Sequence, residues 1–265
     1  MFSNNKKGME MKFLKVLGVI VILLVLILGG GLYYLLSNIN AIVKRGVESK
    51  GPEITTTDVN LDSVDIELFK GRAQLDRFTI ANPPGFNSPN LFEAEQLVFK
   101  VDPSSVRSDV IIIDEIIVEG VKVTAEQKGL NTNIQTMLKA IQENLPKSRQ
   151  EEKEASDAGQ EPHFMVQHLR FADSGMRVIT EKYGEKEFLI PAIEANNLGS
   201  KANGLTASEL GVAILKPYLE QAKKVAQERI QDLAEDELKG AAEKKLKEKF
   251  GEDAEKALDK VKDLF

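Results

Sequence analysis

Residues 61–81 read LDSVDIELFKGRAQLDRFTIA, and this stretch decides the structural class of the central part of the chain. Val64, Ile66 and Leu68 alternate with acidic side chains, which is the period of a β-strand with one buried face and one solvent-exposed face. Residues 70–71, Lys-Gly, follow as a turn. The stretch therefore predicts two consecutive strands rather than a helix.

The second of these strands changes phase along its length. Ala73 and Leu75 lie on one phase of the alternation, whereas Phe78 and Ile80 lie on the other. Because an extra residue inserted into a strand shifts the alternation in this way, the sequence predicts a β-bulge near residues 76–77.

Further strand patterns follow downstream. Residues 110–120, VIIIDEIIVEG, are apolar on both phases, which is typical of a strand covered on both faces. The other predicted strands cover residues 97–101, 121–127, 163–173, 174–180 and 187–199, with tight turns expected at 119–120 and near 173–174. Sequential strands joined by short turns predict an antiparallel meander, so the expected fold class is α+β with a curved antiparallel sheet.

One helix is predicted inside this series of strands. Asn131 or Asn133 is expected to cap it, and Ile134, Met137 and Ile141 belong to an apolar stripe at helical spacing. This helix is the expected cover of the sheet.

Residues 206–265 are predicted to be helical and amphipathic. Thr206 and Glu209 have capping-box spacing, Pro217 is expected to kink the helix, and Phe250-Gly251 resembles a stop. Three interpretations remain open: a helix docked on its own domain, self-association, and a surface for a partner protein.

Upstream of the strands, residues 16–36, VLGVIVILLVLILGGGLYYLL, contain no charged side chain. About 20 apolar residues match the thickness of a bilayer at helical rise, so we predict one transmembrane helix. A cleaved signal peptide is the alternative, but the apolar run continues past Gly29–Gly31 through paired tyrosines. Residues from 37 onward are expected to cross the membrane. Residues 37–50 are predicted to form a short helix that Gly51 and Pro52 end.

The composition excludes several functions. A net charge of −6 argues against nucleic acid as a partner, and the absence of cysteine excludes a disulfide scaffold and thiol catalysis. His163 and His168 are five residues apart on a predicted strand, which places them on opposite faces, so they cannot bind one metal ion together. The acidic residues within 146–162 are interpreted as a solvated charge run. We predict no catalytic residue, no metal site and no cofactor, hence not an enzyme.

The sequence thus divides into consecutive parts. They are a cytoplasmic tail (1–15), a transmembrane helix (16–36), the first part of a β-domain (37–145), a flexible linker (146–162), the second part of the β-domain (163–204) and a C-terminal helical region (205–265).

Several segments resemble the N-terminal region of AsmA-like proteins. The resemblance covers about residues 10–215 and is most specific at GRAQLDRFTIANPPGF, residues 71–86; it continues in VFKVDPSSVRSDVIIIDEIIVEGVKVTAEQ and in the NNLG and GLTASEL segments. It implies a short member of a group anchored in the inner membrane of Gram-negative bacteria, with a periplasmic domain whose apolar β-groove handles lipids. No catalytic residues are known for that group.

The resulting functional prediction is lipid transport or outer-membrane and envelope maintenance through an apolar groove, with membrane phospholipid as the partner. The alternative is a non-enzymatic tether or assembly factor that recruits an envelope protein, or a second copy, through residues 205–265. The predicted groove-lining residues are Val64, Ile66, Leu68, Phe78, Ile80, Leu97, Phe99, Ile111 and Ile113. A closed hydrophobic core made of the same residues is the competing interpretation.

Overall fold

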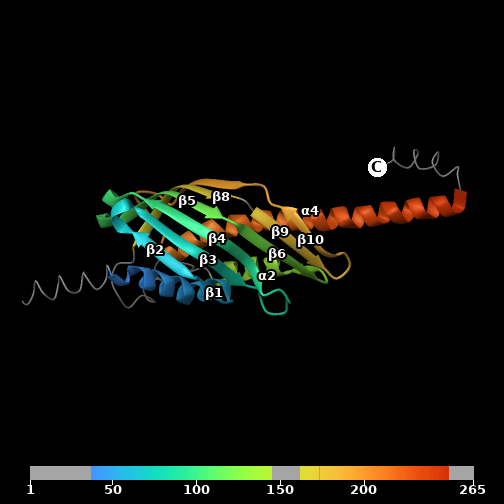
Figure 1. Ribbon diagram of the computed structural model, residues 1–265, viewed down its shortest axis with the longest axis horizontal. Helices are drawn as coiled ribbons and strands as arrows, with labels where there is room; N and C mark the ends of the chain where they lie inside the picture. The colour runs from blue at the N-terminus through green and yellow to red at the C-terminus, as the bar shows by residue number, and fades with distance from the viewer. Residues whose placement is uncertain (1–36, 145–161, 173, 251–265) are drawn as a thin grey trace, which may run out of the picture.

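The computed structural model describes residues 37–144, 162–172 and 174–250 (Figure 1). The predicted tail and membrane helix (1–36), nearly all of the predicted linker, and residues 251–265 lie outside the described residues. Within the described part, no helix combines the length and the apolar character needed to cross a membrane.

The fold is α+β and consists of a curved, unclosed, mixed β-sheet with helices packed on one face (Figure 1). The strands are β1 (Val59–Asn60), β2 (Ser63–Glu67), β3 (Arg72–Ala81), β4 (Asn90–Val101), β5 (Val110–Glu119), β6 (Val121–Lys128), β7 (Asn131–Thr132), β8 (His163–Phe171), β9 (Ser174–Thr180), β10 (Gly184–Leu189) and β11 (Ile193–Leu198). A helix over residues 37–55, α2 (Asn133–Asn144), α4 (Ala207–Phe250) and the 3-10 turns η1 (Leu68–Lys70) and η2 (Pro103–Arg107) complete the described structure.

Strands β5 and β6 form one continuous line, because both pair with β4 in the same register. Gln96 lies opposite Glu119 and Glu93 lies opposite Lys122, so the chain keeps its direction through Gly120. The predicted tight turn at residues 119–120 is therefore wrong. A glycine with positive φ suits a turn and a kink in a strand equally well.

Strands β8 and β9 also form one line, which runs parallel to β5–β6. Val110 pairs with His163 and Val121 pairs with Ser174, the same offset of 53 residues in both places. The predicted turn near residues 173–174 is wrong for the same reason. Strands β10 and β11 continue this pattern as an antiparallel line along β9 and β8.

The parallel pairing corrects the predicted all-antiparallel meander. Helix α2 lies in the chain between β6 and β8, and a connection of this length lets the chain return in the same direction. Within the described residues the sheet order is thus β1–β2, β3, β4, β5–β6, β8–β9 and β10–β11.

A transverse crease crosses the sheet at the level where the strands break. We define the crease as Asp62, Arg77, Glu95, Gly120 and Pro191, which the strand registers place in one row. Arg77 has φ +50° and forms an ion pair with Asp62, and Gly120 has φ +61°. Strands β3 and β4 keep their register there, so the β-bulge predicted near residues 76–77 is wrong, and the positive φ of Arg77 accompanies the phase change instead.

The crease inverts the alternation of side chains. Leu75 and Ile80 are both buried although an odd number of positions separates them, and the same holds for Val118 and Val121. Residues 110–120 contain a second irregularity: the register with β4 shifts around Asp114. Ile113 and Ile116 consequently belong to one core cluster. The register shift therefore accounts for the apolar residues on both phases of this segment, which the sequence prediction attributed to a strand covered on both faces.

Helices α2 and α4 cover one face of the sheet, which we call the inner face. Ile134, Met137 and Ile141 of α2 and Tyr218 and Leu219 of α4 are fully buried in the main core. The ring of Tyr218 stacks on Phe171 at 4.3 Å between centroids and meets Phe92 edge-on at 5.6 Å. Full burial of such side chains contributes about 1.5–3 kcal/mol each, so α4 is a principal component of the core.

The first turns of both helices are capped by side chains. In α4 the predicted capping box is confirmed, since Glu209 N–H donates to Thr206 Oγ1 (3.2 Å) and Thr206 N–H donates to Glu209 Oε2 (2.9 Å). In α2 the capping residue is Thr132, which forms the equivalent pair with Gln135. The predicted Asn131 or Asn133 cap is wrong, because the side chain of Asn133 takes part in a buried hydrogen-bond network instead.

The helix over residues 37–55 runs beside β1–β2 and continues one turn past the predicted stop. Gly51 lies against Val59, where a Cβ atom would come within 2.7 Å, so this glycine allows close packing instead of ending the helix. Pro52 O accepts from Thr56 N–H (2.9 Å), and the helix ends at Thr56, whose φ is +59°.

Candidate functional site

The nine predicted groove residues come from adjacent elements, β2 to β5 with η1. Val64, Ile80 and Ile113 are buried in the two core clusters. The other six are half-buried, and none is exposed. Among these six, Ile66, Phe78, Leu97 and Phe99 pack against the clusters, whereas Leu68 and Ile111 belong to neither.

Burial along the inner face differs on the two sides of the crease. On the side of α2, the inward residues Ile80, Phe92, Val121, Val123, Met176 and Val178 are all buried. On the side of η1 and η2, Leu75, Ile116, Val118, Leu169 and Phe171 are buried as well, but a contiguous group stays half-buried: Ile66, Leu68, Ala73, Leu97, Phe99, Val101 and Ile111. The helices therefore bury most of the inner face and leave a half-buried apolar group near η1 and η2.

The half-buried group is contiguous because of strand register. Ile66 lies opposite Ala73, and Ala73 lies opposite Phe99, so one half-buried row crosses three neighbouring strands and ends at the buried Ile116 of β5. Neighbouring strands are about 4.8 Å apart, which gives a row roughly 10 Å long. Such a row offers an apolar strip rather than isolated contacts.

A buried polar network lies on the far side of the crease and includes the one carboxylate among the described residues that is buried. Glu126 accepts hydrogen bonds from the backbone N–H groups of Asn87 (2.8 Å) and Ser88 (2.8 Å). Burial opposes the charge, but these hydrogen bonds outweigh it, so the pKa of Glu126 lies below its ordinary value. A carboxylate held ionised by two backbone donors fixes the loop after β3 and is a poor general acid.

Asn133 joins this network to helix α2. Its amide Nδ2 donates to Asn82 Oδ1 (2.8 Å) and Thr124 O (2.7 Å), and its Oδ1 accepts from Glu126 N–H and Ile134 N–H (2.9 Å each). All the hydrogen-bonding atoms of this side chain have partners, which makes its role structural. Sequence reasoning missed this role because it depends on tertiary contacts, including the one with Asn82, 51 residues away.

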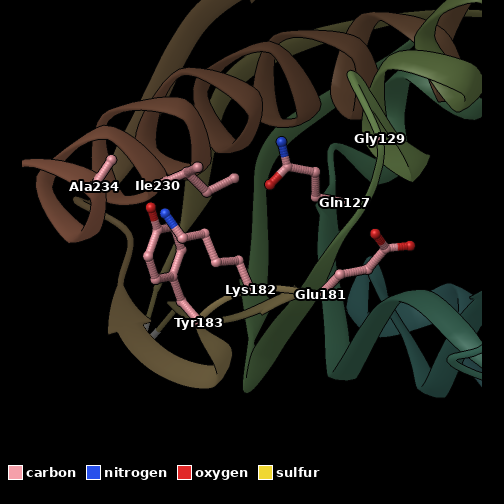
Figure 2. A pocket seen from close by; sticks show the side chains of 7 residues that line it. All are labelled: Gln127, Gly129, Glu181, Lys182, Tyr183, Ile230 and Ala234. Carbon is pink, nitrogen blue, oxygen red and sulfur yellow. The ribbon is translucent and has the colours of Figure 1, made fainter. Parts of the chain in front are cut away.

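A shallow pocket of about 300 Å³ lies where α4 passes the turn between β9 and β10 (Figure 2). Lys182 forms an ion pair with Glu237 at 2.5 Å, and its ammonium lies 5.1 Å from the centre of the Tyr183 ring. This pairing raises the pKa of Lys182 and lowers the pKa of Glu237. Glu181 and Lys182 contribute charge to the lining, and the pocket is partly open to solvent. It is therefore better suited to attaching α4 to the turn than to binding an acyl chain.

No group of three potential metal ligands occurs among the residues the structure describes. The imidazole of His168 is hydrogen-bonded through Nδ1 to Asn196 Oδ1 at 2.7 Å on the neighbouring strand. Neither observation supplies a catalytic arrangement.

A scan against protein-family models gives no match for this chain, and a search of curated proteins gives none either.

Proposed function

We propose that this protein is a membrane-anchored, non-enzymatic lipid-handling protein of the bacterial envelope, as its resemblance to AsmA-like proteins implies. In this proposal the half-buried part of the inner face, around Phe99, contacts lipid acyl chains. The observation that supports it is the contiguous group of half-buried apolar residues near η1 and η2, on a face that is otherwise largely buried.

The energetic argument rests on the apolar strip. Ile66 on β2 and Leu97 and Phe99 on β4 retain solvent-exposed apolar area, and Ala73 of β3 lies between them. Each lipid methylene that leaves water is worth about 0.8 kcal/mol, so a few methylenes lying along the strip give a measurable affinity. A whole lipid would need more apolar area than the strip offers, which favours partial and transient contact with an acyl chain.

The test is photo-crosslinking in the full-length chain in native membranes. Benzoylphenylalanine at Phe99 is expected to give a phospholipid adduct, detected by mass spectrometry of the purified protein. The matched control is Phe188 of β10, which is also a half-buried phenylalanine on the core but lies on the α2 side of the crease. Equal adducts at both positions, or none at Phe99, would contradict the proposal.

A tether is the second candidate, and helix α4 favours it. Burial of α4 ends near Ile230, yet the helix continues to Phe250 beyond the sheet (Figure 1), and Leu238 is 72% exposed. The same crosslinker at Leu238 distinguishes the two functions. A protein adduct at Leu238 without a lipid adduct at Phe99 supports the tether, and the reverse result supports lipid handling.

A further inference from the structure

The turns η1 and η2 form an apolar tip at the end of the sheet where the half-buried group lies. We define the tip as residues 68–70 and 103–107. Phe69 of η1 is 98% exposed, and Val106 of η2 is 45% exposed. Because η1 and η2 are in contact, Phe69 and Val106 expose apolar surface at one place, and grouped exposed apolar side chains are typical of interaction sites.

The tip is a built structure rather than a loose loop. Gly71, at φ +61°, donates its N–H to Leu68 O and accepts from Val101 N–H at 2.7 Å. A Cβ atom at Gly71 would come within 3.0 Å of Pro103, so the two turns are in close contact. Lys70 pairs with Glu67 at 2.6 Å and lowers the pKa of that carboxyl group. These contacts hold Phe69 outward.

The position of the tip relative to the predicted membrane helix follows from the helix beside β1–β2. Lys44 Nζ donates to Leu61 O and Asp62 O, and Asn40 Oδ1 accepts from Ile66 N–H at 3.1 Å. Earlier helix residues therefore lie beside later strand residues.

Extending this antiparallel arrangement locates Phe69. From Asn40 back to Ser37, the first described residue, the helix advances about 4.5 Å. From Ile66 forward to Phe69 the chain advances roughly 6–10 Å in the same direction. Phe69 thus lies level with Ser37 or beyond it, and Figure 1 places the tip and the start of the described helix at the same end of the sheet. The predicted membrane span, residues 16–36, joins the chain at this end.

We propose that the tip inserts into the interfacial region of the bilayer that holds the predicted span, with Phe69 and Val106 in contact with lipid. The exposed basic side chains of Lys70 and Arg107 flank them and suit a phosphate headgroup layer. This inference rests on the proposed function in one respect: insertion holds the half-buried strip of the inner face against the membrane surface.

The experiment uses the absence of tryptophan from the chain. Phe69→Trp gives the full-length protein a single indole, which is reconstituted in liposomes of phosphatidylethanolamine and phosphatidylglycerol. The matched control is Leu130→Trp. Leu130 is 96% exposed but follows β6, roughly 60 Å along the strand line from η2.

Insertion predicts a blue-shifted emission for Phe69→Trp, quenching by lipids brominated on the acyl chain, and protection from iodide. Leu130→Trp is expected to emit as in water and to be quenched by iodide. Water-like emission from both variants, or lipid quenching of both, overturns the inference.

Co-flotation of the protein with the liposomes is measured separately, and a chain that does not co-float also overturns it. The crosslinking at Phe99 reports the proposed function independently. The two experiments can therefore give different results. Insertion of the tip without a lipid adduct at Phe99 contradicts only the proposed function, and a lipid adduct at Phe99 without insertion contradicts only this inference.

Discussion

The geometry of the crease at Gly120 allows us to predict how much free energy of unfolding is lost when this residue is replaced. Replacing Gly120 by alanine places a Cβ atom at φ +61°, where the left-handed conformation costs a residue with a side chain about 1–2 kcal/mol. That Cβ atom would also lie 2.5 Å from Cγ and 2.7 Å from Cβ of Glu95 on the neighbouring strand, and overpacking of this kind adds about 1–3 kcal/mol. The expected loss in free energy of unfolding is therefore about 2–5 kcal/mol.

Gly129→Ala is the matched control for this substitution. Gly129 has φ +59°, and a Cβ atom there meets nothing within 4 Å, so only the conformational cost of about 1–2 kcal/mol applies. Urea denaturation of the full-length chain in detergent, followed by far-ultraviolet circular dichroism, measures both variants. Equal losses for Gly120→Ala and Gly129→Ala would refute the crease and restore an open turn at Gly120.

Three further predictions follow from the core, the buried carboxylate and the fastening of α4. Tyr218→Phe removes a fully buried hydroxyl whose pKa burial raises to about 12 and whose one neighbouring hydroxyl within the described residues, that of Ser174, forms no well-aligned hydrogen bond with it, so thermal unfolding is expected at an equal or higher temperature; a clear fall would show that the contact with Ser174 stabilises the fold. Glu126 has a lowered pKa in the folded state, so its stabilising contribution is complete above its ordinary pKa of about 4.5 and disappears as the pH falls through the lower folded value. Glu126→Gln should thus flatten the acid side of the stability profile in denaturation measured between pH 2 and 6, and an unchanged slope would contradict this. Lys182→Ala removes an exposed ion pair with Glu237 and should leave global unfolding unchanged while it speeds amide exchange in α4 near residue 237, and unaltered exchange there would argue against the fastening role.

The sequence predicts the parts of this fold that depend on local patterns. The alternation of Val64 and Ile66 in β2 and the capping box at Thr206 depend on residues close in the chain, and the structure confirms both. Leu68 belongs to η1 instead of the strand, and the phase change at Arg77 is not the predicted bulge. The strand lines could not be predicted in the same way. A glycine such as Gly120 has positive φ in a turn and in a crease alike, and only the register with β4 distinguishes the two.

The same distinction between local patterns and long-range contacts applies to the candidate site. Alternation identified apolar residues of one face, but which of them stay half-buried depends on where α4 and α2 dock, and docking is a property of the whole fold. Phe69 was overlooked because it occupies a turn, where periodicity carries no information. A large aromatic residue directly before Lys-Gly in a predicted turn was the signal that could have identified it.

The position of α4 in the chain also dictates an order of assembly. Every strand of the sheet precedes residue 207, so the strands can pair before the helix that seals the inner face has been synthesised. During that interval the part of the inner face that α4 covers, including Phe171 against Tyr218, is open to solvent, and it becomes buried when Tyr218 and its neighbours dock. Nascent chains at this stage are the form of the protein most prone to aggregate and most dependent on a chaperone that shields apolar surfaces.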